Sequence, residues 1–147
     1  MPPDNPLVHH DLCFGCGQAN LFGLQLEVGP SPDGGVEGRF FVKQDHQGPP
    51  GFAHGGVLAA ALDEAMALLV YAEEEFALTR RLEVDLLAPA PVGTFVRLTA
   101  EIETAEGRTL RLRASASSAE GSEVAVARGV FVRSEGTAES TSGGGRT

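Results

Sequence analysis

The stretch that most constrains this chain is Gly48–Tyr71, GPPGFAHGGVLAAALDEAMALLVY. A loop rich in Pro and Gly leads into His54-Gly55-Gly56, and a continuous segment of strong helix formers follows. The pattern predicts one helix from about Gly56 to about Glu74. Because apolar residues surround this helix on nearly every side, most of its surface must be buried.

The remainder of the chain favours strands. Apolar and polar residues alternate in several segments, as in half-buried strands, and clusters of Gly, Pro, Asp and Ser separate them. The expected strands are Leu24–Val28, Val36–Val42, Leu78–Leu87, Thr94–Glu103, Arg108–Ser118 and Glu123–Val132. The order β-β-α-β-β-β-β indicates an α+β fold, in which an antiparallel sheet curls around the helix or a partner covers what the sheet leaves open.

A length of 147 residues predicts one domain. Residues 1–23 contain three prolines near their start and are expected to be an irregular N-terminal segment. Residues 24–133 carry the predicted elements and form the expected domain. Residues 134–147 have almost no apolar content, so we expect a disordered C-terminal tail.

The net charge of -9 and the pI near 4.8 argue against a general nucleic-acid binder, which needs a basic face for the phosphates. A polyanionic ligand would therefore require a local basic patch. No secretory signal pattern follows Met1. The longest apolar run, Val57–Tyr71, contains two acids and is shorter than the ~20 residues that a bilayer span needs. We expect a soluble, cytoplasmic protein that does not bind membranes.

Cys13 and Cys16 form the only CxxC pair in the sequence. A structural zinc site needs four ligands, and His9 and His10 lie just upstream and could complete one. A redox pair has less support because no βαβ pattern surrounds the cysteines. The favoured interpretation is a Gly-rich turn with small buried thiols, and we expect neither a metal nor a cofactor.

Two adjacent acids, Asp63 and Glu64, interrupt the apolar helix. Adjacent helical residues point about 100° apart, so the two carboxylates face different surroundings. Asp63 shares its stripe with small or apolar residues, which would allow close approach by a ligand. Either acid could instead mark a solvent-facing patch, and the helix pattern alone does not decide between them.

The start of the helix offers a second candidate group. The N–H groups of Gly55 and Gly56 lack intrahelical partners and lie at the positive end of the helix dipole. Asp63 follows Gly55 by eight residues, about 12 Å along the axis. An elongated substrate along this face could place a carbonyl at these donors, with Asp63 as general base or nucleophile. His54 could be a catalytic base, but on the pattern alone a histidine that hydrogen-bonds a loop carbonyl is favoured.

The segment HQGPPGFAHGGVLAAALDEAMA resembles the hot-dog-fold acyl-CoA thioesterases, in particular the branch that includes the phenylacetate-pathway thioesterase. The upstream CFGCGQANLFGLQLEV resembles the N-terminal signature of many bacterial members. The resemblance spans residues 12–133. It implies a curled antiparallel sheet around one long central helix, protomers paired edge to edge into a homodimer or a homotetramer, and active sites at the dimer interface.

The resemblance also implies roles for individual residues. Asp63, rather than Glu64, matches the catalytic carboxylate, and Thr79 matches a hydroxyl residue that the other protomer supplies to position the attacking water. The remaining matches are Gly55 with Gly56 as the oxyanion donor, His54 near the thioester, and His46 or Gln47 as the polar residue of the preceding loop.

Coenzyme A is polyanionic, so the resemblance implies a basic patch near the mouth of the groove. Arg80 and Arg81 adjoin Thr79 and are the first candidates. Arg108, Arg111 and Arg113 are second candidates, with an ordinary solvated strand face as the alternative.

The function that follows from the resemblance is an acyl-CoA thioesterase that hydrolyses an acyl- or aryl-CoA to the free acid and coenzyme A. Three alternatives remain open. The chain could be a hot-dog hydratase or dehydratase, a non-catalytic protein that binds acyl-CoA, or a zinc module through Cys13 and Cys16.

Overall fold

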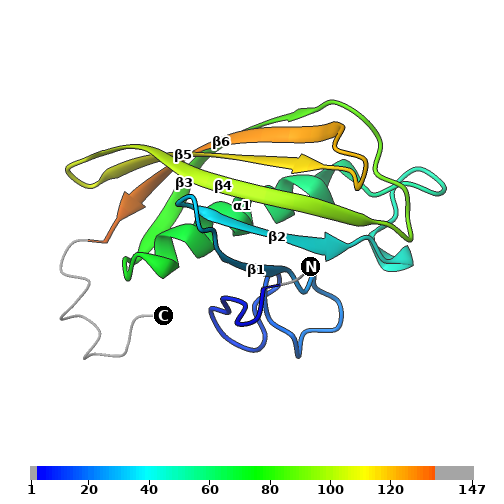
Figure 1. Cartoon of the computed structure of the whole chain (residues 1–147), viewed down its shortest axis with the longest axis horizontal. Helices are drawn as coiled ribbons and strands as arrows, with labels where there is room; N and C mark the ends of the chain where they lie inside the picture. Colours follow the sequence, from blue (N-terminus) through cyan, green and yellow to red (C-terminus); the bar gives the residue numbers. More distant parts are fainter. Residues whose placement is uncertain (1–2, 135–147) are drawn as a thin grey trace.

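The computed structural model describes residues 3–134 and contains six strands, one long helix and one short 3-10 helix (Figure 1). The elements are β1 (Glu27–Pro30), β2 (Val36–Phe41), η1 (Gln44–His46), α1 (Gly55–Ala72), β3 (Ala77–Leu86), β4 (Phe95–Glu106), β5 (Thr109–Ser117) and β6 (Glu123–Arg133). The predicted element order is confirmed.

The strands form one antiparallel sheet in the order β1-β2-β4-β5-β6-β3. β1 and β3 are therefore the edge strands, and β3 pairs only with β6. α1 crosses one face of this sheet and contacts all six strands (Figure 1). The expected α+β arrangement, a sheet wrapped around one helix, is confirmed.

The start of α1 is fixed by a side-chain cap. His54 has an extended backbone, and its Nδ1 accepts a hydrogen bond of 2.8 Å from the Gly56 N–H. The helix ends at Ala72, two residues before the predicted end, and Glu74 adopts a left-handed φ of 61°. Acidic residues are unfavourable at the negative end of a helix dipole, which accounts for the exclusion of these glutamates from the helix.

The core lies between α1 and the inner face of the sheet. Alternate residues of β4 and β5 are buried there, as the alternation predicts. α1 contributes eight buried side chains, Leu58, Ala61, Leu62, Ala65, Met66, Leu68, Leu69 and Val70. With 18 residues and a mean hydropathy of 1.5, α1 meets the length and composition of a membrane span, although the sequence pattern suggested a shorter run. Its packing under the sheet accounts for the same composition.

The first strand differs from the prediction. It begins at Glu27 rather than at Leu24, because Gln25 has a left-handed φ of 53° that interrupts an extended chain. Leu24 and Leu26 are nevertheless buried, so these two apolar side chains pack into the core from a loop rather than from a strand. The hairpin between β1 and β2 turns through Gly34 and Gly35, both at positive φ, as the turn cluster predicts.

The remaining boundaries shift by a few residues. β4 continues to Glu106, so the following turn lies at Gly107 rather than at 105–107. No helix or strand occurs between residues 3 and 23. Apart from Ser134, the predicted disordered tail lies outside the described residues.

Truncating a buried side chain of α1 tests the packing of helix on sheet. Leu68 is fully buried, so Leu68→Ala should lower the free energy of unfolding by about 2–5 kcal/mol, measured by urea denaturation. Leu21 is 71% exposed, and Leu21→Ala is the matched control with a change within about 0.5 kcal/mol. Equal effects of the two substitutions would contradict the described packing.

Candidate active site

Asp63 and Thr79 meet beside the edge strand β3. The Thr79 hydroxyl donates a hydrogen bond of 2.7 Å to Asp63 Oδ1. The register of β3 against β6 shifts between Thr79 and Arg81, which leaves Arg80 as the extra residue of a β-bulge. Bulges locally re-aim side chains and are frequent next to active sites. The bulge here lies directly beside the Thr79 hydroxyl that reaches the helix.

This contact differs from the expectation that the other protomer supplies Thr79. The hydrogen bond forms within a single chain, because β3 follows α1 and runs alongside it. A partner subunit is therefore not needed to bring these two groups together.

The Asp63 carboxyl occupies a half-buried, low-polarity setting. Burial raises its pKa, the Thr79 hydrogen bond opposes that rise, and the negative charge of Glu64 adds to it, with a raised pKa as the net result. Ala59, Ala60 and Ala67 on the same side of α1 are also only partly buried. The small side chains leave the carboxyl approachable, which is what a general base or nucleophile requires.

The two glycines at the start of α1 are not equivalent. The Gly56 N–H is occupied by the His54 ring. Within residues 3–134, the Gly55 N–H has no acceptor. The first turn of α1 also carries no acidic residue that would neutralise the dipole there. The N–H group that remains open to a ligand is therefore that of Gly55, whereas Gly56 takes part in the cap.

His54 is an exposed helix cap. Its Nδ1 accepts from Gly56, and its backbone N–H donates to the His46 carbonyl at 2.8 Å. The structure supports the interpretation in which His54 hydrogen-bonds the backbone, with an N–H group rather than a carbonyl as its partner.

His46 does not line an open site. Its side chain is buried, Nδ1 accepts from the Lys43 N–H at 3.0 Å, and Nε2 lies 3.2 Å from the Gly23 carbonyl. Burial lowers its pKa, so the ring is held neutral. Both nitrogens fix the loop in this structure, and the match of His46 to the polar residue of the loop stays a prediction. Gln47 is exposed in the same loop, and its side chain accepts from the Gly51 N–H.

The candidate basic residues lie on two different strands, β3 and β5. Arg80 and Arg81 are exposed on β3, and Arg81 forms an ion pair of 2.7 Å with Glu83. In the described part of the chain no ion pair involves Arg80, so it is the freer cation beside Thr79. On β5, Arg111 and Arg113 alternate with buried residues and point away from α1. They belong to the solvated outer face.

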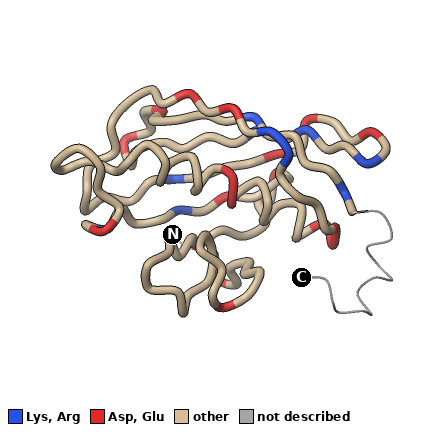
Figure 2. The backbone as a smooth tube through the Cα atoms, turned by 180° about the vertical axis from the view of Figure 1, so that it is seen from behind, with Lys and Arg blue, Asp and Glu red and all other residues tan. Residues whose placement is uncertain are grey.

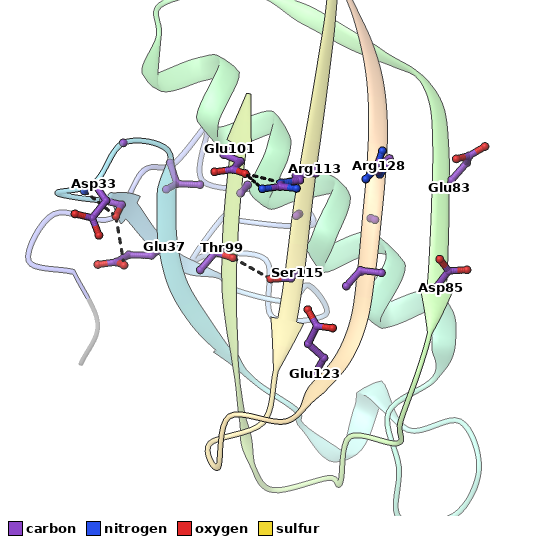
Figure 3. Close-up of a pocket in the computed structure, with 17 residues that line it drawn as sticks. Asp33, Glu37, Glu83, Asp85, Thr99, Glu101, Arg113, Ser115, Glu123 and Arg128 are labelled. Carbon is purple, nitrogen blue, oxygen red and sulfur yellow. Dashed lines mark hydrogen bonds and ion pairs between the residues drawn. The ribbon is translucent and has the colours of Figure 1, made fainter. Parts of the chain in front are cut away.

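A hollow of about 840 Å³ lies on that outer face, and Asp63 is not among its lining residues (Figure 3). Its charged lining consists of six carboxylates and two guanidinium groups, from Asp33, Glu37, Glu83, Asp85, Glu101, Glu123, Arg113 and Arg128. The close-up shows these side chains on the side of the strands opposite α1. Acidic positions also outnumber basic ones along the backbone as a whole (Figure 2). An acidic hollow repels a polyanion, so this hollow is a poor candidate for a coenzyme A site, and Asp63 remains the candidate.

A second polar cluster surrounds Glu64. His9 Nδ1 lies 2.9 Å from Glu64 Oε2, and the thiols of Cys13 and Cys16 lie close to both groups. The hydrogen bond to Glu64 raises the pKa of His9 to about 9. Burial favours a higher pKa for Glu64, but the hydrogen bonds from His9 and Cys16 outweigh it and lower that pKa. Burial raises the pKa of the Cys16 thiol. The sequence singled out His9 and both cysteines, but gave no signal that Glu64 joins them.

The thioesterase superfamily model matches residues 50–125, just over half of the chain. This match includes the capped helix start, α1 and the strand that carries Thr79. The chain belongs to the thioesterase superfamily.

Curated relatives within the superfamily match over a shorter region. The acyl-coenzyme A thioesterase THEM5 of Mus musculus is 35% identical over 88 residues, which cover 59% of this chain and 36% of the relative. The THEM4 enzyme of Rattus norvegicus is 33% identical over 64 residues, which cover 44% of this chain and 27% of the relative. The chain thus spans about a third of the length of these relatives.

Solved structures confirm the hot-dog fold. A thioesterase superfamily protein superposes with a TM-score of 0.74 at 26% identity, over 86% of this chain and 64% of that one. A Bacillus halodurans protein crystallised with CoA gives 0.68 at 26% identity, over 76% of each chain. The Escherichia coli PaaI protein from the phenylacetic acid degradation operon gives 0.69 at 20% identity, over 74% of this chain and 82% of that one.

Removing the Thr79 hydroxyl should raise the Asp63 pKa further, because the hydrogen bond to the carboxylate is the one contribution that lowers it. We expect Thr79→Val to shift the Asp63 titration to higher pH in carboxyl-detected NMR. Thr79→Ser keeps a hydroxyl and is the matched control with a titration close to wild type. Identical titrations of the valine and serine variants would contradict the contact.

Proposed function

We propose that this chain is an acyl-CoA thioesterase. The observation that carries the proposal is the Asp63 carboxyl, half-buried on an apolar helix, oriented by the Thr79 hydroxyl, on the same helix as the unpartnered Gly55 N–H. Gly55 would stabilise the oxyanion of the thioester carbonyl. Asp63 would activate a water molecule or attack the carbonyl carbon directly.

Membership in the superfamily and the names of the curated relatives support this activity. The Bacillus halodurans neighbour with CoA supports a coenzyme A thioester as the substrate. Arg80, exposed and next to Thr79, is our candidate for contact with the phosphates, and Arg81 contributes less because Glu83 neutralises it. Gln47 is the remaining polar candidate in the loop before the helix.

The spacing of the two groups along α1 favours a site shared between two subunits. Gly55 and Asp63 of one chain are about 12 Å apart along the helix axis. In direct attack, the carbonyl oxygen lies about 3 Å from its donor, and the carbonyl carbon lies about 3–3.5 Å from the attacking atom. The donor and the attacking atom are then only about 7 Å apart. One thioester therefore does not fit between these two groups of the same helix for direct attack.

A second copy of the chain, related by a two-fold axis, would shorten the distance between a Gly55 N–H and an Asp63 carboxyl. β3 is an edge strand whose outer side has no neighbour in the described chain, and such an edge pairs readily with another strand. Exposed apolar residues lie on or next to it, including Leu78 at 65% and Leu86 at 55% exposure. Pairing of two β3 strands antiparallel would set two α1 helices side by side in opposite directions, with Gly55 of one subunit near the partner subunit's Asp63. We propose a homodimer with two such sites.

Turnover of a panel of acyl- and aryl-CoA thioesters, measured by release of free thiol, tests the activity. Asp63→Asn keeps the size of the side chain but removes its basicity, and should lower kcat/KM by about 10²–10⁴-fold. Asp85 is an exposed acid on the outer face, so Asp85→Asn is the matched control and should retain the wild-type rate.

Three other results would change this assignment. Wild-type rates in Asp63→Asn would contradict the role of this carboxyl. Tight binding of coenzyme A esters by calorimetry without turnover would make the protein a non-catalytic binder. Hydration of crotonyl-CoA without thiol release would make it a hydratase.

Hybrid dimers test the shared site. Proline lacks the N–H and is well tolerated at the first helical position, so Gly55→Pro removes the proposed donor and should lower the rate by about 10²–10³-fold. Gly55→Ala is the matched control, because it keeps the N–H while placing a similar Cβ against the Leu86 side chain. Co-expression of Gly55→Pro with Asp63→Asn should restore activity, since one of the two sites then contains both wild-type groups.

The same experiment separates this proposal from the activity itself. A hybrid as inactive as its parents, with an active wild type, would mean that each site is built within one subunit. A wild type that is monomeric by light scattering and fully active would contradict the shared site and leave the thioesterase activity intact.

A further inference from the structure

The cluster around Glu64 brings together four side chains that can bind a metal. His9, Cys13 and Cys16 come from the irregular N-terminal segment, and Glu64 comes from the middle of α1. One ligand atom from each residue lies within 4.8 Å of all the others. Because 48 residues of chain separate Cys16 from Glu64, only the tertiary fold brings them together.

The separations match a tetrahedral site. Zinc bonds of about 2.0–2.3 Å at tetrahedral angles place neighbouring ligand atoms about 3.3–3.8 Å apart. From His9 Nδ1, the Glu64 oxygen lies at 2.9 Å, the Cys16 sulfur at 3.5 Å and the Cys13 sulfur at 3.9 Å. The Cys13 sulfur lies 3.4 Å from the same Glu64 oxygen. For these four pairs of atoms, shifts of a few tenths of an ångström would reach tetrahedral separations, and every pair lies within 4.8 Å.

The donor set also indicates which metal fits. Two cysteine sulfurs and one imidazole nitrogen are soft or borderline ligands that favour Zn²⁺ over Mg²⁺ and Ca²⁺, which prefer oxygen ligands. The CxxC spacing is that of structural zinc sites. Cys16 is fully buried, and the Glu64 side chain is only 13% exposed. Four protein ligands in a shielded position leave little room for a substrate, so a structural role is favoured.

The surrounding backbone is shaped around these ligands. The His9 N–H donates to the Cys16 sulfur at 3.1 Å, and the Cys16 N–H donates to the Cys13 sulfur at 3.5 Å. Both N–H groups therefore point at the sulfur atoms that would bind the ion. Gly15 lies directly against the Glu64 side chain, because a Cβ there would be 2.3 Å from the Glu64 Cγ. The Tyr71 ring packs edge-on against His9 with centroids 5.0 Å apart.

We propose that His9 Nδ1, Cys13 Sγ, Cys16 Sγ and a Glu64 carboxylate oxygen form a structural Zn²⁺ site that fastens the N-terminal segment to α1. This proposal replaces the expectation that the two cysteines are merely buried thiols in a turn. It also assigns a purpose to Glu64, which points about 100° away from Asp63 around the helix. The ion would thus hold α1 from a different side than the one that carries the proposed catalytic carboxyl.

Metal analysis of the full chain tests the site without reference to any activity. The protein is purified without a histidine tag under reducing conditions, stripped with a chelator, and reconstituted with zinc alone. We expect about one zinc per chain by mass spectrometry, and a Tm that falls on stripping and recovers with zinc, since binding energy at such a site is also folding energy. Reconstitution with Co²⁺ should give the visible absorption of a tetrahedral thiolate-bound ion.

Substitutions identify the ligands. Cys16→Ser and Glu64→Gln should each lower zinc occupancy and abolish the dependence of Tm on zinc. The matched controls are His10→Ala and Glu73→Gln, because His10 and Glu73 are exposed neighbours outside the cluster, and both should bind zinc as wild type does. The wild-type stripping and reconstitution experiment decides the question even where a ligand variant fails to fold.

Two results would overturn the proposal. In the first, the reduced wild-type protein binds no zinc or cobalt, and its Tm does not respond to either metal. The hydrogen bond between His9 and Glu64 would then hold the N-terminal segment against α1 without a metal. In the second, the purified chain shows no free thiols until it is reduced and takes up no zinc afterwards, which would make Cys13 and Cys16 a disulfide.

Discussion

The burial of α1 under the sheet is the interaction on which the rest of this structure depends. Complete burial of a large apolar side chain contributes about 1.5–3 kcal/mol, whereas a helix cap contributes about 1 kcal/mol. The eight buried side chains of α1 therefore outweigh the His54 cap by far in stability. The cap has a different effect, because it sets where the helix starts and leaves the Gly55 N–H open at that end.

A helix buried on most sides gives its two acids very different surroundings. Asp63 faces the edge strand β3, with one hydroxyl as its partner, and its pKa is raised. Glu64 faces the N-terminal segment, with His9 and two thiols beside it, and its pKa is lowered. A turn of about 100° between adjacent residues is sufficient to separate a group suited to proton transfer from one suited to holding structure.

Local patterns predicted most of the fold. The helix, the order of the elements along the chain and the Gly34-Gly35 hairpin follow from periodicity and turn chemistry, which depend on near neighbours in the chain. The resemblance selected Asp63 where the helix pattern did not. The error in the first strand has a physical cause outside the local pattern, because Gln25 adopts a left-handed φ that interrupts the extended chain. The burial of His46 by loop packing lies outside that pattern as well. Neither effect leaves a periodic trace in the sequence.

By itself, the sequence determined the apolar helix, the spacing of eight residues between Gly55 and Asp63, and the sheet that must enclose them. Only the tertiary structure decided which groups meet. In the folded chain, the Thr79 hydroxyl donates to Asp63, and the Gly56 N–H donates to the His54 ring that caps the helix. The tertiary structure also placed Glu64 against His9, Cys13 and Cys16. The physical reason is that helix and strand periodicity fix which face a residue occupies, whereas the partner on that face is set by packing between segments distant in the chain.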